Sequence, residues 1–117
     1  MVKLSLNKLL LILSLTLGLT TASQAGFVSN RDAWEGLTDI GKRYYIMGVF
    51  DDMMVRHITD DDAQLEYKNH IKQCVIQNEV SQVTLADMVD NYYQDVENWT
   101  LRPRYALKYS LLKFCKL

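Results

Sequence analysis

The chain has 117 residues, 49% of them hydrophobic, and a formal net charge of −1. Residues 26–117, which follow an expected export signal, have the length of one domain and lie near the size at which one hydrophobic core is only marginally stable. The charge is uneven, because all 14 acidic residues precede position 98, whereas residues 98–117 hold five basic residues and no acidic one. Such a tail can contact nucleic acid or membrane, but a last helix with a solvated basic face explains it more simply.

Residues 1–25 have the three parts of a secretory signal. Two lysines precede an apolar core over Leu9–Leu19, and small residues stand at the positions that direct cleavage after Ala25. The apolar run is well short of the ~20 residues that a membrane span needs. We therefore expect a periplasmic mature domain of residues 26–117 that contacts neither membrane nor nucleic acid.

Cys74 and Cys115 are the only two cysteines. The export signal places them in an oxidising compartment, where disulfides form and persist. They lack both the CxxC redox spacing and a nearby pair of histidines for a metal. We therefore expect one structural disulfide, and closing a loop of roughly 40 residues stabilises the fold by about 4 kcal/mol in the chain-entropy model.

Helix signals begin with Asn30, which can cap a short helix over 32–35. Thr38 is the expected cap of a first long helix over 40–55, whose apolar residues recur at three- and four-residue spacing. That pattern predicts a mostly buried helix. Gly48 lies in its middle, at a cost of up to ~1 kcal/mol relative to alanine, so we expect another helix to approach closely there.

A second long helix is expected over 61–76, capped by Thr59 or Asp60. Because it is mostly hydrophilic, it should lie on the surface, with the disulfide at its end. Thr84 is the expected cap of a third helix, and Pro103 fits the first turn of a final one. No strand-like alternation is present, so the sequence predicts an all-α compact bundle of four main helices and one short N-terminal helix.

No group of residues combines a nucleophile, a base and an orienting partner. His57 and His70 lie 13 residues apart and are better explained as solvated side chains than as metal ligands. The run Asp60–Asp62 resembles a calcium loop only superficially, since Leu65 and Ile71 stand where glycine and glutamate are needed. We therefore expect a protein that is not an enzyme and holds no metal or cofactor.

Aromatic residues offer a candidate interface, because they are enriched at binding hot spots. Trp99 falls in a predicted loop beside Arg102 and Arg104, and with Asn98 and Tyr93 it forms our candidate partner-binding set. Trp99 could equally plug the connection between two helices. By position, six tyrosines fall into a set that we expect to be buried and a set that we expect to be exposed. The buried set is Tyr44, Tyr92 and Tyr105, and the exposed set is Tyr45, Tyr93 and Tyr109.

A series of residues in a fixed order gives the chain a family resemblance. The series is Trp34, Leu37, Tyr44-Tyr45-Ile46-x-Gly48-Val49-x-Asp51, Cys74, Val83-Thr84, Val89, Tyr93, Ala106, Leu111 and Phe114-Cys115. In this order the chain resembles the Rap/Tai family of immunity proteins, which protect a bacterium from cell-wall amidase effectors of type VI secretion. The resemblance covers most of residues 26–117. It implies a periplasmic homodimer that occludes the groove of a papain-like amidase with a loop or helix end.

An acid-stress periplasmic chaperone of the HdeA type is the alternative. Such proteins are also small, helical and joined by one disulfide, and they expose apolar surface when acid protonates their carboxylates. The 14 acidic residues would permit that linkage between protonation and stability. The first cysteine of that group comes early in the mature chain, however, whereas Cys74 follows the first long helix.

Overall fold

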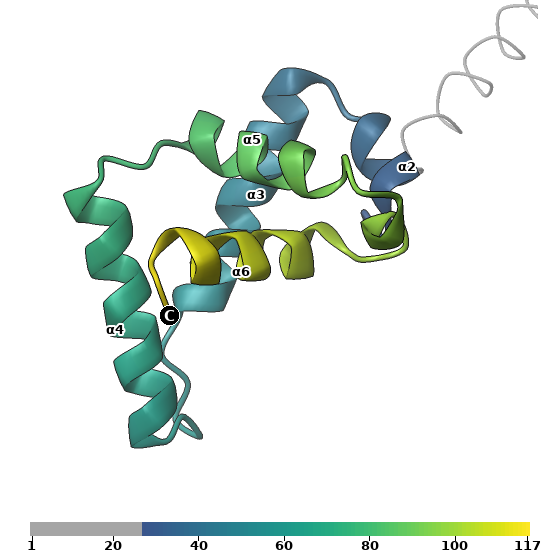
Figure 1. The fold of residues 1–117 in the computed structure, drawn as a ribbon. Coiled ribbons are helices and arrows are strands. Elements are labelled where there is room, and N and C mark those ends of the chain that lie inside the picture. The colour runs from purple at the N-terminus through teal and green to yellow at the C-terminus, as the bar shows by residue number, and fades with distance from the viewer. Residues whose placement is uncertain (1–26) are drawn as a thin grey trace, which may run out of the picture.

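The computed structural model of the chain describes residues 27–117, so the signal predicted for residues 1–25 lies outside the described part. Within it the chain is helical and contains no strand (Figure 1). The elements are α2 (Arg31–Glu35), α3 (Asp39–Met54), α4 (Asp62–Gln77), α5 (Gln82–Tyr92), the 3-10 turn η2 (Val96–Asn98) and α6 (Pro103–Phe114). Four main helices and one short one confirm the predicted all-α bundle.

Side-chain caps fix the starts of the first two helices. The Asn30 carboxamide accepts a hydrogen bond from the Ala33 amide at 2.9 Å, and the Thr38 hydroxyl accepts one from the Gly41 amide at 3.1 Å. Each cap satisfies an amide that has no partner within its helix. Pro103 opens α6, where its missing N–H leaves no gap, so three predicted starts are confirmed.

Two predicted caps were wrong. Asp61 caps α4 in a reciprocal capping box with Gln64, because Gln three residues after the cap can bond back to its amide. Ser81 caps α5, and its hydroxyl accepts from the Thr84 amide at 3.3 Å. Serine is at least as good a cap as threonine, so the helix begins one turn earlier than predicted.

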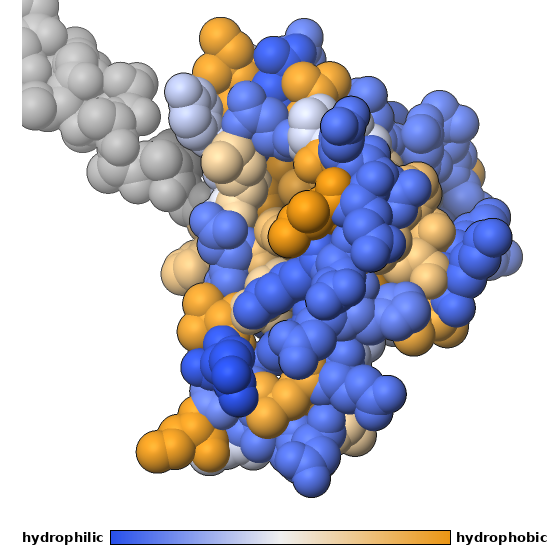
Figure 2. All heavy atoms as spheres, turned by 90° about the vertical axis from the view of Figure 1, so that its left-hand side faces the viewer, coloured by the Kyte–Doolittle hydropathy of each residue, from blue (hydrophilic) through white to orange (hydrophobic). Residues whose placement is uncertain are grey.

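Two helices, α5 and α6, form a layer that α3 crosses, and α4 lies at one side of it. α5 and α6 lie side by side, α3 passes behind both, and α4 stands next to the C-terminal end of α6 (Figure 1). The face that carries α4 is hydrophilic over much of its middle, and hydrophobic residues show on either side (Figure 2). This agrees with the prediction that α4 is a surface helix.

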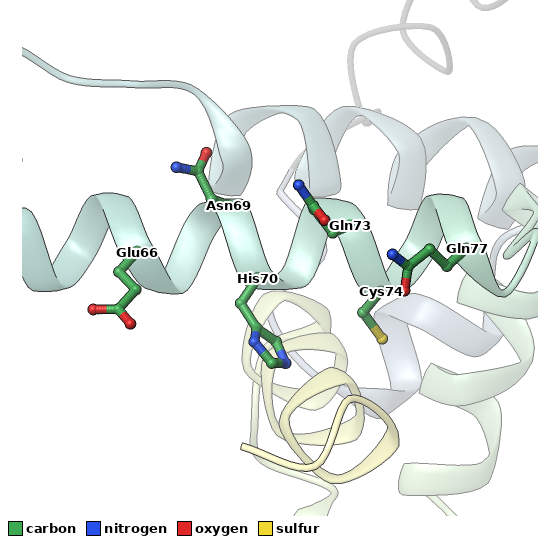
Figure 3. Close-up of a pocket in the computed structure, with 6 residues that line it drawn as sticks. All are labelled: Glu66, Asn69, His70, Gln73, Cys74 and Gln77. Atoms are coloured by element: carbon green, nitrogen blue, oxygen red, sulfur yellow. The ribbon is translucent and has the colours of Figure 1, made fainter.

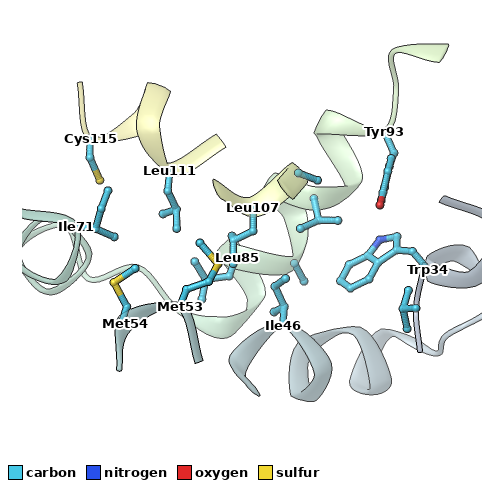
Figure 4. Close-up of a cluster of buried hydrophobic side chains, with 14 residues drawn as sticks. Trp34, Ile46, Met53, Met54, Ile71, Leu85, Tyr93, Leu107, Leu111 and Cys115 are labelled. Carbon is cyan, nitrogen blue, oxygen red and sulfur yellow. The ribbon is translucent and has the colours of Figure 1, made fainter. Parts of the chain in front are cut away.

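The hydrophobic core joins all five helices in one cluster (Figure 4). Trp34 from α2, Ile46 from α3 and Leu107 from α6 are fully buried. Ile71 is the main anchor of α4, since it is the one fully buried apolar residue of that helix. The core members are Val28, Trp34, Ile46, Met53, Met54, Ile71, Leu85, Ala86, Val89, Tyr93, Ala106, Leu107, Leu111 and Cys115.

A partly buried polar contact beside Trp34 links three helices. The indole N–H donates to the Asp90 carboxylate at 2.7 Å, and the Lys42 ammonium lies 3.0 Å from the same oxygen. Burial lowers the pKa of Lys42, but the hydrogen bonds and charges of Asp90 and Glu35 outweigh it, so the pKa is raised. Lys42 therefore stays charged although it is mostly buried, because two carboxylates neutralise it.

The burial of α3 differs from the prediction. Its apolar residues surround the helix, so spacing alone could not tell the inner face from the outer one. Ile46 and Met53 face the core, whereas Tyr44, expected to be buried, is 72% exposed. Among residues 27–117, no atom outside the neighbourhood of Gly48 lies within 4 Å of its would-be Cβ, so this part of the chain does not make the expected close helix contact.

Replacing Leu107 with alanine tests how much the core contributes to the free energy of unfolding. Leu107 is fully buried, so Leu107→Ala should lower the free energy of unfolding by about 2–5 kcal/mol through lost burial and a residual cavity. Urea denaturation followed by circular dichroism measures the change. Lys108→Ala, one residue away and exposed, should change it by less than about 0.5 kcal/mol, and equal losses would contradict the assignment.

Candidate functional site

The disulfide joins the end of α4 to the end of α6. Cys74 and Cys115 are bonded, with their Cα atoms 5.9 Å apart, which confirms the predicted pairing. Beside it, the His70 ring lies 3.2 Å from the Cys115 carbonyl oxygen through Nε2. The adjoining hollow has a volume of about 330 Å³. Figure 3 shows that two of its lining residues, His70 and Cys74, point toward the last turn of α6. Its other lining residues are Glu66, Asn69, Gln73 and Gln77.

Removing this bond should destabilise the domain. Cys74→Ser with Cys115→Ser should lower the free energy of unfolding by about 2–5 kcal/mol, as for native disulfides of small secreted domains. Denaturation of the oxidised protein, the double variant and the dithiothreitol-treated protein measures this. The reduced protein and the variant should agree, and unchanged stability in both would contradict the role of a structural staple.

The Trp99 loop, residues 95–102, connects α5 to α6. The Trp99 indole N–H donates to the Tyr93 carbonyl at 2.8 Å, and the Arg31 amide donates to the Trp99 carbonyl at 3.0 Å. The Arg31 guanidinium lies 4.3 Å from the centroid of the Trp99 ring, a cation–π distance. Trp99 nevertheless keeps 39% of its surface exposed. It therefore plugs the connection, as one of the two alternatives predicted, and also leaves part of its ring exposed.

Two residues of the candidate set support this loop from within. Tyr93 is 2% exposed, so its predicted exposure is wrong. Its hydroxyl donates to the Leu101 carbonyl, and burial raises the pKa of its phenol. Asn98 donates to the Tyr92 carbonyl at 2.9 Å. Both side chains satisfy buried backbone groups and hold the loop in shape.

The two arginines of the set lie apart. Arg102 is exposed at the start of α6, three residues after Trp99. Arg104 instead forms an ion pair with Asp52 of α3, and the Arg104 hydrogen bond and charge lower the pKa of that carboxyl. Both partners are largely exposed, so the pair contributes little stability. Sequence proximity thus predicted Arg104 beside Trp99, but helical geometry turns it toward α3.

Arg31 is the member of this surface that sequence reasoning missed. It lies 68 positions before Trp99 and reaches it only because the core brings α2 against the Trp99 loop. No spacing or motif in the sequence connects the two residues. Arg31 also lies 3.6 Å from Asp32, a neighbouring exposed carboxylate.

A second hollow, the α5–α6 groove, is more apolar. It has a volume of about 530 Å³ and is lined by Met88 and Tyr92 of α5 and by Tyr109, Lys113 and Phe114 of α6, among others. The rings of Tyr92 and Tyr109 stack with centroids 6.1 Å apart. Tyr109 is about half exposed, as predicted, whereas Tyr105, expected in the core, is also 45% exposed.

A polar corner, consisting of Asp60 and Lys68 with Val55 and His57, closes the turn between α3 and α4. The Lys68 ammonium donates to the Asp60 carboxylate and to the Val55 carbonyl, both at 2.7 Å. The His57 amide donates to the same carboxylate at 2.9 Å. The Asp60 side chain is only 6% exposed. These hydrogen bonds, that from Lys68 first, lower the pKa of Asp60.

This corner should make stability fall in acid. Because the folded-state pKa of Asp60 lies below its ordinary value of 3.8, its contribution is complete above that pH and is lost as pH falls through the folded-state pKa. Asp60→Asn should therefore lower the urea midpoint at neutral pH and reduce the fall in midpoint between about pH 5 and about pH 2. Asp87→Asn, at an exposed carboxylate of α5, should leave the acid profile as in the parent protein.

Residues 27–117 contain no cluster of three or more histidine, cysteine, aspartate or glutamate side chains that could hold a metal ion. Among the helices in this range, none is long and apolar enough to cross a membrane. The structural class is therefore a small all-α domain with one disulfide, whose surface offers an aromatic loop and shallow hollows.

Comparison with known proteins identifies no relative of this chain. No protein-family model matches the chain, and neither does any curated protein or solved structure.

Proposed function

We propose that the protein is a periplasmic immunity protein that binds a peptidoglycan amidase effector of type VI secretion and covers its active-site groove. It is exported with cleavage after Ala25, and it acts by occlusion, without catalysis or a cofactor. The proposal joins the resemblance to the Rap/Tai family with one structural observation, the Trp99 loop.

The observation that carries the proposal is that this loop is ordered and still exposes its aromatic residue. Trp99 is held by its indole hydrogen bond to Tyr93 and by the Arg31 guanidinium over its ring. A loop that is rigid before binding loses little conformational entropy on binding. A half-exposed tryptophan beside an arginine is the combination enriched at interface hot spots.

The proposed contact places Trp99 in the entrance of the amidase groove, with Arg102 at the rim. Desolvating the remaining surface of the indole supplies apolar free energy, and Arg102 can pair with a carboxylate or carbonyl of the amidase. Substrate is then excluded because the loop occupies the space of the peptide. No residue of the immunity protein needs to react.

Trp99→Ala should weaken inhibition of the amidase encoded by a neighbouring gene. Loss of a hot-spot tryptophan costs about 2 kcal/mol or more, roughly a thirtyfold rise in Kd. Calorimetry with the purified amidase, and release of peptide from cell-wall fragments, measure binding and inhibition. Thr100→Ala, at the exposed next residue, is the matched control and should bind as the parent protein does.

Arg102→Glu keeps the proposal testable if Trp99→Ala disturbs the loop. Arg102 is exposed and makes no side-chain cap to α6, so its replacement should leave the fold intact and weaken binding with a changed salt dependence. Full inhibition by both variants, or no binding by the parent protein, would refute the proposed contact.

An acid-stress chaperone of the HdeA type is the second candidate, and the polar corner favours it. Protonating Asp60 would leave the Lys68 ammonium, which is 11% exposed, without its counter-charge. Lys68 and Ile71 are the buried residues of α4, so loss of the pair would loosen that helix and uncover apolar surface. A rise in bound-dye fluorescence near pH 2–3, with protection of an acid-denatured client, is expected of a chaperone; a flat signal would exclude this candidate.

A further inference from the structure

The α5–α6 groove has the size and the lining of a small-molecule site. Ligand pockets have volumes of roughly 300–1,000 Å³ and apolar walls with a few polar groups, and this groove has a volume of about 530 Å³. Its apolar walls are Met88, Tyr92, Tyr109 and Phe114. Tyr109 and Phe114 keep 46% and 43% of their surface exposed. The groove therefore presents aromatic surface to solvent between two packed helices.

The groove is about one helical turn long. α5 and α6 lie side by side (Figure 1), and the groove is lined by residues 88–92 of one and 109–114 of the other. At about 1.5 Å per residue these spans are roughly 6–8 Å. A docked helix needs anchors over two turns. A groove of this length therefore fits one ring and a short chain rather than a helix.

The two tyrosines give the groove a flat aromatic wall. The rings of Tyr92 and Tyr109 stack with an interplanar angle of 20° and centroids 6.1 Å apart. Burial, followed by the charges of Tyr109 and Asp95, raises the pKa of Tyr92, so its phenol stays neutral and does not repel an anion. Because almost half of the Tyr109 surface is exposed, the ring of a ligand can stack on it or meet it edge-on.

The groove carries a positive charge and no negative one. Lys113 follows Tyr109 by four residues, so it lies on the same face of α6, about 6 Å along the axis. Within residues 27–117, Lys113 forms no ion pair, and no carboxylate lines the groove. The two acidic residues of α5, Asp87 and Asp90, line a different hollow, beside α3. An anion at Lys113 therefore meets an attractive charge without a competing carboxylate.

We propose that the α5–α6 groove binds a small aromatic carboxylate, in which a short carbon chain joins one ring to the carboxylate. The ring lies against Tyr109 and Phe114, and the carboxylate pairs with Lys113 one turn away. The Asn91 carboxamide of α5 also lines the groove and can donate to the second carboxylate oxygen. None of these residues belongs to the Trp99 loop, and the proposal does not rest on the immunity function.

Titration of 3-phenylpropionate into the isotope-labelled protein, purified from the periplasm of an expression host, tests the site. The amide chemical shifts of residues 88–92 and 109–114 should saturate with a Kd of about 1 mM or below. 3-Phenylpropanamide keeps the ring and lacks the charge, so it should bind about two- to fivefold more weakly, as expected for the loss of one exposed ion pair. Acetate keeps the charge and lacks the ring, and it should give no saturable shift.

Two variants separate the charge from the ring contact. Lys113→Met, at an exposed position, should raise the Kd of the acid to that of the amide and leave the Kd of the amide unchanged. Tyr109→Ala should weaken the binding of both compounds by at least about threefold. Lys108→Met, at another exposed lysine of α6, is the matched control and should bind both compounds as the parent protein does. Thermal unfolding curves check that each variant is folded.

Three results of the titration would overturn the proposal: equal binding of the acid and the amide, shifts that cluster outside the groove, or no saturable shift. Unchanged binding of the acid by Lys113→Met would overturn it as well. So would saturation by a peptide that ends in phenylalanine but not by 3-phenylpropionate, because the groove would then belong to a polypeptide.

Discussion

The indole of Trp34 is the contact on which the rest of the structure depends. It is fully buried, its N–H is bonded to Asp90 of α5, and its ring lies edge-on to Tyr45 of α3 at 6.3 Å between centroids. The Lys42 ammonium, 5.4 Å from the ring centroid, neutralises the same carboxylate. One side chain from a five-residue helix thus fixes how α2, α3 and α5 meet. That packing in turn sets Arg31 against Trp99.

The helices and the disulfide were predictable because their causes are local or unique. Caps such as Asn30 and Thr38 act on amides three residues away, and two cysteines allow only one intrachain pair. The burial of α3 was not predictable, since apolar residues surround it and only tertiary packing selects a face. The contact of Arg31 with Trp99 was not predictable either, because the fold alone brings together residues 68 positions apart. The direction of the Arg104 side chain was not predictable for the same reason, because its partner Asp52 is 52 positions away in the sequence.

α4 is held to the rest of the domain by fewer core residues than the other long helices. α3, α5 and α6 share most of the core, whereas α4 is held by Ile71, by the Lys68–Asp60 pair and by the disulfide. Ile71 packs into the shared core, whereas the Lys68–Asp60 pair and the disulfide lie outside it. Acidity and reducing agents therefore act first on the contacts that hold α4.

The position of the disulfide also determines how the molecule responds to force. The bond closes a ring from Cys74 to Cys115 that contains α5, the Trp99 loop and α6, and leaves α2 and α3 outside it. A pull on the two ends of the chain can separate α3 from the ring, but it cannot extend the segment between the cysteines, which are 41 positions apart. At ~3.3–3.6 Å per residue, the oxidised chain extends roughly 140 Å less than the reduced one, and the α5–α6 pair keeps its connection under load.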